Sequence, residues 1–205
     1  MKITYVTGNY GKYVSIKERF QDHKIDIAFH NVDLKEPEIN DIEKISKAKA
    51  LAAYDILKSP CFVADSGFYI DAYPNNPGYP GAFVKRSGIS NDVDKLLKTM
   101  EGIENRSCRF VDCLTFYDGI NFYTFYGVSE GSLSKEKKGQ LEKKAKSNLW
   151  SVFIPKNCGK TLAEMDDYER KHRDDGHTSA TEEFILWYKK EYLTEKTYKK
   201  KKTPC

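Results

Sequence analysis

A glycine-containing turn near the N-terminus is the first segment whose residue types could do chemistry. Thr7-Gly8-Asn9-Tyr10-Gly11-Lys12 follows an apolar run and precedes residues with helical spacing. Such a turn exposes backbone N–H groups, and the helix dipole and the Lys12 charge add positive potential. Gly8 and Gly11 also let the backbone come close to an anion. The segment therefore suits a polyphosphate, although a plain strand-to-helix turn explains the local pattern equally well.

An acidic tripeptide is the second candidate. Asp65-Ser66-Gly67 follows the short apolar run Cys61–Ala64, which we expect to be a buried strand. Ligands of open α/β folds gather at the carboxyl ends of strands. A carboxylate there can bind Mg²⁺ or accept a proton from water. The competing interpretation is an aspartate that only begins a turn, which is the commoner role of Asp-Ser-Gly.

Four acidic residues lie at or just before the start of the clearest predicted helix, which spans 43–57. One of them could complete a site for a hard cation with Asp65. For most of the four, interaction with the positive end of the helix is the simpler explanation. The five cysteines and four histidines lack the spacing of known metal-binding motifs. The four acids are Glu36, Glu38, Asp41 and Glu43.

The elements that must position these residues alternate between strands and helices. Runs of β-formers predict strands over 1–7, 25–32, 61–64, 68–72, 107–117, 120–127 and 149–154. Apolar residues at helical spacing predict helices over 12–20, 43–57, 91–100, 163–170 and 181–193. Asp118-Gly119 predicts a hairpin turn, and the charged stretch 134–146 a solvated helix or loop. This order predicts an α/β fold.

Length, composition and charge limit the possible number of domains and the possible cellular compartment. The chain has 205 residues, of which 40% are hydrophobic, and no apolar run approaches the roughly 18 residues of a membrane span. We expect one domain over 1–193 and a disordered lysine-rich tail over 194–205. The net charge of +4 is matched by Lys199–Lys202 alone, which does not favour nucleic-acid binding. The N-terminus does not resemble a secretory signal, so we expect a cytoplasmic protein outside membranes.

Six segments in a fixed order carry a resemblance to a known family. They are TGNYGK at 7–12, PEIN at 37–40, KAKALAAY at 47–54, VADSGFYIDAY at 63–73, GYPGAF at 78–83 and GKTLAEM at 159–165. With them the chain resembles the inosine/xanthosine triphosphate pyrophosphatase family. The resemblance implies an elongated α/β fold with a long mixed sheet and two lobes around a central cleft. It also implies Mg²⁺-dependent hydrolysis of nucleoside triphosphates to the monophosphate and pyrophosphate, and a homodimer.

The resemblance also implies roles for individual residues. Asp65 corresponds to an acid that binds the metal and accepts a proton, and Glu38 to a metal-binding glutamate. Ser66 corresponds to a substrate contact, and Lys49 to a lysine that faces the phosphates. This agrees with the chemistry, because Mg²⁺ and two lysines offset the charge that builds when water attacks the α-phosphate. The other expected substrate-binding residues are Thr7, Gly8, Asn9, Lys12, Arg170 and His177.

The half of the site that holds the base departs from the family pattern. A GFGYDPIF-like segment is replaced by residues 146–153, and Arg170 stands where a substrate-binding lysine is expected. The arginine that reads a purine 6-oxo group is replaced by Thr178, after His177, unless Arg173 folds back into the pocket. We therefore expect a hydrolase with altered base specificity. The alternative is a catalytically weak nucleotide-binding module on the same fold.

Overall fold

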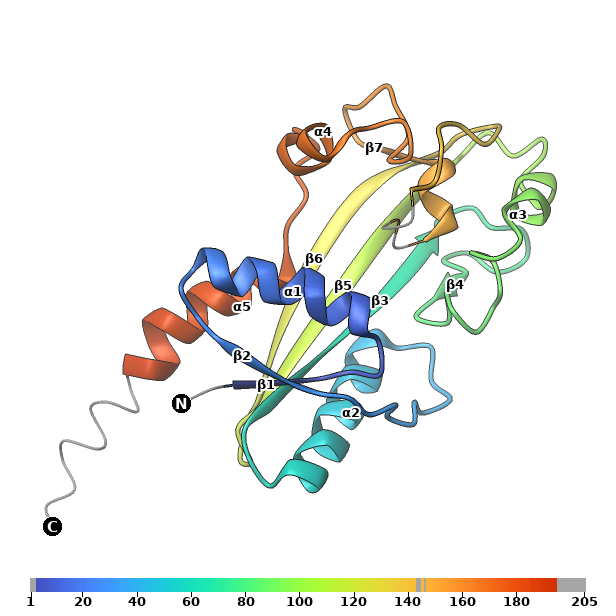
Figure 1. The fold of residues 1–205 in the computed structure, drawn as a ribbon. Helices are drawn as coiled ribbons and strands as arrows, with labels where there is room; N and C mark the ends of the chain where they lie inside the picture. Colours follow the sequence, from blue (N-terminus) through green and yellow to red (C-terminus); the bar gives the residue numbers. More distant parts are fainter. Residues whose placement is uncertain (1–2, 143–144, 146, 195–205) are drawn as a thin grey trace, which may run out of the picture.

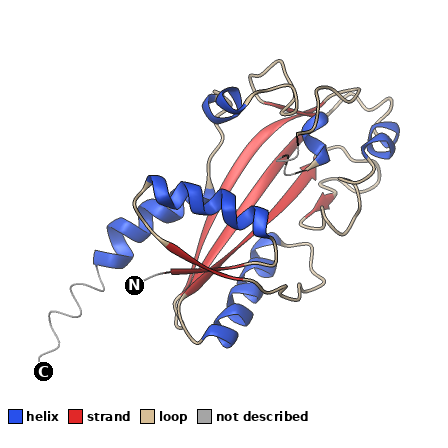
Figure 2. Cartoon of the chain, viewed as in Figure 1, coloured by secondary structure: helices blue, strands red, loops and turns tan. Residues whose placement is uncertain are grey.

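A mixed sheet of seven strands forms the centre of the described chain (Figure 2). The computed structural model describes residues 3–142, 145 and 147–194. The strands are Ile3–Val6 (β1), Ile27–His30 (β2), Cys61–Ile70 (β3), Pro80–Gly81 (β4), Ser107–Tyr117 (β5), Phe122–Leu133 (β6) and Phe153–Pro155 (β7). Their order is β2-β1-β3-β5-β6-β7, and β4 pairs with β3. β1 runs parallel to β2 and β3, and the other pairs are antiparallel.

Helices cover both faces of this sheet (Figure 1). They are Tyr10–Asp22 (α1), Ile42–Leu57 (α2), Val93–Thr99 (α3), Asp167–His172 (α4) and Ala180–Trp187 (α5), with a 3₁₀ helix over Asn148–Ser151 and a π-helical turn over Tyr188–Tyr192. Successive side chains of a strand point to opposite faces. Phe62 of β3 therefore packs toward α1 and α5, whereas Cys61 and Val63 pack toward α2.

Two hydrophobic cores lie at opposite ends of the long strands β3, β5 and β6. The first core joins Phe62 of β3 to α1 and α5, and the second joins Phe68 of β3 to α3, β7 and the 3₁₀ helix. Between them, on the same face of the sheet, the side chains of Ser66 and Asp112 are exposed. The predicted α/β class, with a mixed sheet and two lobes, is confirmed (Figure 1).

Side-chain caps fix where the two helices nearest Asp65 begin. The Asn9 side chain accepts a hydrogen bond from the Lys12 backbone N–H at 3.0 Å, so α1 begins at Tyr10, two residues earlier than predicted. The Asp41 side chain accepts from the first backbone N–H groups of α2. Such caps satisfy N–H groups that have no partner within the helix. Asp41 therefore has the helix-starting role that the sequence favoured for most of the four acids.

The strand that carries Asp65 differs from its predicted form. Every residue from Cys61 to Ile70 pairs with β5, so β3 runs unbroken through Asp65-Ser66-Gly67. Asp65 thus lies within a strand and not at the end of one, and its backbone is held on one side by β5. The two predicted strands over 61–64 and 68–72 are one element.

Two predicted elements in the second lobe also differ. The predicted strand over 149–154 begins as the 3₁₀ helix, capped by Ser147, and only Phe153–Pro155 pairs with β6. The predicted helix over 163–170 is replaced by α4, which starts later because Asp166 and Glu169 form a capping box. Local capping chemistry therefore decided both boundaries against the apolar pattern.

Some predictions, among them the strand over 1–7, fall partly on residues outside the described ranges, which exclude 1, 2, 143, 144, 146 and 195–205. Positions 135–142 are exposed and belong to no helix or strand, as expected for a solvated segment. The proposed tail over 194–205 stays a prediction. Within the described chain, no helix combines the length and the apolar character that crossing a membrane requires.

Candidate active site

The edge of β3 opposite β5 is open in the middle of the strand. β1 pairs with β3 only at Cys61 and Phe62, and β4 pairs with it only at Phe68 and Tyr69. In the described chain, the edge from 63 to 67 therefore has no strand partner on this side. The start of α1, the middle of α2 and the loop before α2 all contribute side chains at this opening.

A lysine of α2 joins two carboxylates at the opening. The Lys49 ammonium makes an ion pair with Oδ1 of Asp65 and another, at 3.0 Å, with Glu36. The Lys49 side chain is 15% exposed and that of Asp65 10% exposed, so water screens the pair weakly. Burial acts to lower the pKa of Lys49, but the charges and hydrogen bonds of Asp65 and Glu36 outweigh it and raise that pKa. Lys49 is therefore firmly cationic.

The second carboxylate oxygen of Asp65 has no hydrogen-bond partner among the residues that the structure describes. Oδ2 is buried, and none of the described residues hydrogen-bonds to it. A buried acceptor without a partner costs free energy, and more so when it is charged. A proton donor or a cation brought by a ligand would satisfy such an atom.

Lys12 reaches the same opening from α1. Its ammonium lies 3.4 Å from the Ala64 carbonyl oxygen of β3 and donates to it. Burial lowers the pKa of Lys12, and the charge of Asp65 opposes that shift. In the turn before α1, the Thr7 hydroxyl accepts from the Asn9 backbone N–H at 3.1 Å, while Gly8 is exposed. The turn is thus held in shape by its own side chains.

Glu38 and Glu36 differ in position although both belong to the loop before α2. The Glu38 side chain is 91% exposed and pairs only loosely with Arg86, at 3.8 Å. Glu36 instead shares Lys49 with Asp65. Burial acts to raise the pKa of Glu36, but the hydrogen bond and charge of Lys49 outweigh it and lower that pKa. Glu36 is the acid that this geometry brings to Asp65.

Ser66 faces the other side of the sheet from Asp65 and finds a partner that sequence reasoning missed. Its hydroxyl donates to Oδ1 of Asp112 on β5 at 2.5 Å. The two residues are directly opposite in the β3–β5 register. The signal in the sequence was an aspartate within an otherwise β-forming run, but only the pairing register places it beside Ser66.

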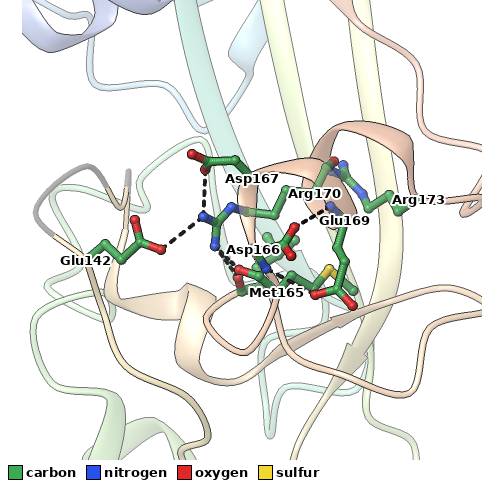
Figure 3. Close-up of polar contacts among 8 residues, drawn as sticks. Glu142, Met165, Asp166, Asp167, Glu169, Arg170 and Arg173 are labelled. Carbon is green, nitrogen blue, oxygen red and sulfur yellow. Dashed lines mark hydrogen bonds and ion pairs between the residues drawn. The ribbon is translucent and has the colours of Figure 1, made fainter.

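Arg170 is fully engaged within the second lobe (Figure 3). Its guanidinium donates to the carbonyl oxygens of Leu162 and Met165 and pairs with Asp167 at 2.7 Å and Glu142 at 3.2 Å. The same group lies 5.4 Å from the Trp150 ring centroid, in cation–π contact. Arg170 therefore fastens α4 to the neighbouring loop and to Trp150.

Asp175 organises the segment that contains Arg173 and His177. Its buried carboxylate accepts a hydrogen bond from Nε of Arg173 and pairs with Nδ1 of His177, both at 2.6 Å. It also accepts a hydrogen bond from the Ser129 hydroxyl at 3.2 Å. The other Arg173 nitrogens reach Ser129 and the Arg170 carbonyl. Arg173 thus lies over β6 and does not point toward Asp65-Ser66-Gly67, two strands away. Thr178 is likewise tied to the β6 backbone, through Val128.

Sequence and fold both match known proteins. A family model described as the Ham1 family matches residues 3–187. The chain belongs to the Ham1 family. A dITP/XTP pyrophosphatase of Saccharolobus solfataricus is 35% identical to this Ham1 protein over 174 residues, 84% of this chain and 86% of the relative. Inosine triphosphate pyrophosphatase 1 of Trypanosoma cruzi is 34% identical over 175 residues, 82% of this chain and 83% of the relative.

Solved structures agree with the family at the level of the fold. A HAM1 protein of Coxiella burnetii superimposes with a TM-score of 0.74, covering 94% of this chain and 99% of that one, at 22% identity. At this identity the likeness concerns the fold alone. The family resemblance inferred from the six sequence segments is confirmed by these matches.

The predicted site residues of this Ham1 protein fall into two groups. Lys12, Lys49 and Asp65 lie at the open edge of β3, next to the turn that holds Thr7, Gly8 and Asn9. The other predicted residues make their described contacts elsewhere, and their roles stay predictions. Glu38 pairs with Arg86, and Ser66 donates a hydrogen bond to Asp112. Arg170 bonds within the second lobe, and His177 bonds to Asp175.

Proposed function

We propose that this protein hydrolyses nucleoside triphosphates to the nucleoside monophosphate and pyrophosphate. The observation that carries the proposal is the ion pair of Lys49 and Asp65 at the open edge of β3, with an unpartnered Asp65 oxygen and the Lys12 ammonium at the same opening. The names of the two curated relatives, a dITP/XTP pyrophosphatase and an inosine triphosphate pyrophosphatase, support it.

Asp65 suits the role of proton acceptor. In the reaction, a water oxygen forms a bond to the α-phosphorus, and the bond from that phosphorus to the bridging oxygen breaks. Pyrophosphate leaves with the electron pair, and the water proton goes to Oδ2 of Asp65. Lys49 donates a hydrogen bond to Oδ1 of the same carboxylate. This bond fixes the orientation of the carboxylate and therefore the position of its unpartnered Oδ2.

Charge on the phosphates is offset by groups already in place. Lys12 and Lys49 are two ammonium groups that meet β3 at the same edge, from α1 and α2. The N-terminal end of α1 adds backbone N–H groups and its dipole. Because these donors are fixed before substrate arrives, they stabilise the growing negative charge without reorganisation.

Magnesium fits the same site as part of the proposal. Among the described residues, no cluster of three or more His, Cys, Asp or Glu side chains could hold an ion by itself. Mg²⁺ often takes one or two carboxylates and completes its shell with phosphate and water oxygens. The carboxylates of Asp65 and of Glu36 or Glu38 would hold it. When bound, the ion supplies positive charge at the phosphate oxygens.

The base preference is proposed to differ from strict selection of 6-oxo purines. Thr178 occupies the position of the expected arginine, and Arg173 is bound by Asp175 and Ser129. A site that has no donor dedicated to the 6-oxo group lacks the unpaired-donor penalty that rejects adenine. Preference for ITP or XTP over the standard nucleotides is therefore relaxed or redirected.

Pyrophosphate release, measured with Mg²⁺ over the standard and deaminated nucleotides, tests the proposal. Asp65→Asn should keep the fold and lower kcat about a hundredfold or more, since a general base contributes at least that factor. Asp55→Asn is the matched control, because Asp55 is an exposed acid near the end of α2 that pairs with Lys58 and not with a residue of the site. It should leave turnover unchanged.

Three results would contradict the proposal or a part of it. Unchanged turnover in Asp65→Asn removes Asp65 from the mechanism. Nucleotide binding without turnover in the wild type favours the nucleotide-binding module. A preference for ITP over ATP and GTP of about a hundredfold or more, the scale that a satisfied polar contact can reach, contradicts the altered base specificity.

The proposal includes a cytoplasmic homodimer that needs Mg²⁺, as the family resemblance implies. Chelation of the metal should abolish pyrophosphate release, and added Mg²⁺ should restore it. Light scattering should give twice the monomer mass of 23.6 kDa. A mass of one monomer at every micromolar protein concentration tested would refute the homodimer. It would leave the proposed hydrolase activity unaffected.

A further inference from the structure

The two lysines at the open edge of β3 differ in what already binds their ammonium groups. Lys12 donates to the Ala64 carbonyl oxygen, and none of the described carboxylates forms an ion pair with it. Lys49 pairs with two carboxylates at once, those of Asp65 and Glu36. An incoming phosphate therefore finds Lys12 without a competing anion, whereas Lys49 is already paired.

The two carboxylates on Lys49 differ in how firmly the fold holds them. Asp65 lies in β3, which pairs with β5 along its whole length, and its side chain is nearly buried. Glu36 lies in the loop of residues 31–41, which is neither helix nor strand, and its side chain is 41% exposed. Of the two acids, Glu36 is therefore the one that can leave Lys49 without disturbing a paired strand.

A phosphate oxygen has the same chemistry as the Glu36 carboxylate that it would meet. Both are anionic acceptors for which an ammonium group is a donor. The Lys49 ammonium already donates one hydrogen bond to Asp65 and another to Glu36. A third anion at the same ammonium group is opposed by the charge of the first two. A substrate phosphate and Glu36 therefore compete for Lys49.

We propose that Glu36 is an internal competitor of the substrate phosphates, an inference that rests on the proposed function. In the empty site Glu36 holds Lys49 beside Asp65, and it releases Lys49 when a triphosphate binds. Because breaking this ion pair costs part of the binding free energy, Glu36 lowers the affinity of the site for polyphosphate chains. It is a positioning residue that acts through Lys49. Of the two glutamates in this loop, Glu38 is then the one that remains to bind Mg²⁺.

Calorimetric binding of inorganic tripolyphosphate in metal-free buffer tests the inference without turnover. Glu36→Gln keeps the size of the side chain and removes its charge. This variant should bind tripolyphosphate about fivefold more tightly than the wild type, because a partly exposed ion pair no longer has to break. The matched control is Glu43→Gln, since Glu43 pairs with Lys47 and Tyr126 and not with Lys49. Its affinity should stay within about twofold of the wild type at physiological salt.

A double variant separates the release of Lys49 from a general change in charge. In a Lys49→Met background the competitor has no ammonium group to occupy, so Glu36→Gln should bring no gain in affinity for tripolyphosphate. A gain of the same size with and without Lys49 would overturn the inference. Weaker binding in the single variant Glu36→Gln would overturn it too, because Glu36 would then be holding Lys49 in its binding position.

A metal ligand and a failed hydrolase assignment give results of their own. If Glu36→Gln leaves metal-free binding unchanged but weakens binding of a nucleoside triphosphate with Mg²⁺, Glu36 is a ligand of the metal and the inference is refuted. If the wild type releases no pyrophosphate from any nucleotide, the hydrolase assignment fails, while tighter tripolyphosphate binding in Glu36→Gln would still support the inference. Absence of tripolyphosphate binding in both proteins refutes the inference whatever the turnover.

Discussion

Asp175 shows how one buried carboxylate can hold an irregular segment. It binds Arg173, His177 and Ser129 and is itself inaccessible to water. Burial acts to raise its pKa, but the hydrogen bond and charge of Arg173 and the bonds from His177 outweigh it and lower that pKa. A carboxyl whose pKa is lower in the folded state adds stability above its unfolded pKa. That contribution is lost as the pH falls through the folded pKa.

Asp175→Asn should therefore lower the free energy of unfolding by about 2 kcal/mol at pH 7, because it removes the charge that Arg173 and His177 face. The difference from wild type should shrink as the pH falls below about 4, where the unfolded-state carboxyl protonates. Urea unfolding at several pH values measures it. Asp174→Asn, an exposed neighbour, is the control and should stay within about 0.5 kcal/mol of wild type. A difference that is constant between pH 3 and pH 7 would contradict the linkage.

At the scale of elements, the chain that leads into α5 approaches the backbone of β6 closely at Gly127. Gly127 lies under the backbone of residues 178–180, and Thr178 bonds to Val128 through both its backbone N–H and its hydroxyl. The segment therefore fits against β6 because no side chain stands between them. Here the need for glycine comes from close approach and not from a positive φ.

Gly127→Ala should lower the free energy of unfolding by about 1–3 kcal/mol, because its Cβ would be forced into backbone atoms that cannot rotate away. Gly159→Ala is the matched control, since a Cβ there meets nothing within 4 Å. Thermal or urea unfolding of the two variants decides the matter. Equal stability of the two would show that the 178–180 backbone moves aside without cost.

At the scale of the whole molecule, two cores share three continuous strands. β3, β5 and β6 pass from the first core to the second, and each core contacts one of the two tryptophans. Trp150 packs on the second core and Trp187 on the first. Because the same three strands carry side chains of both cores, unfolding of one lobe removes packing from strands that the other lobe needs, and we expect the two lobes to unfold together.

The single-tryptophan variants Trp150→Phe and Trp187→Phe test this directly. Fluorescence of the remaining tryptophan should report a single urea transition in each, and within each variant its midpoint should coincide with that from far-ultraviolet circular dichroism. The comparison is made within each variant because each substitution shifts stability by its own amount. A fluorescence midpoint that departs from the circular dichroism midpoint of the same variant would show that the lobes unfold separately.

The sequence predicted structure well where that structure depends on residues close together in the chain. The order of strands and helices, the turn at 7–12 and the α/β class followed from periodicity and turn residues. Element boundaries were weaker, because caps such as those of Asn9, Ser147 and Asp166 shift a start by a few residues against the apolar pattern. The continuous β3 was missed because a polar tripeptide within a strand is indistinguishable from a turn until its pairing is known.

The sequence by itself determined the family, the fold class and the candidate residues around Lys12, Lys49 and Asp65, because six ordered segments and short-range periodicity are properties of the chain. Only the tertiary structure decided which groups meet. It brought Glu36 to Lys49, left Glu38 exposed, and placed Asp112 beside Ser66. The physical reason is that such contacts depend on strand register and loop path. Both are fixed by the packing of residues far apart in the chain.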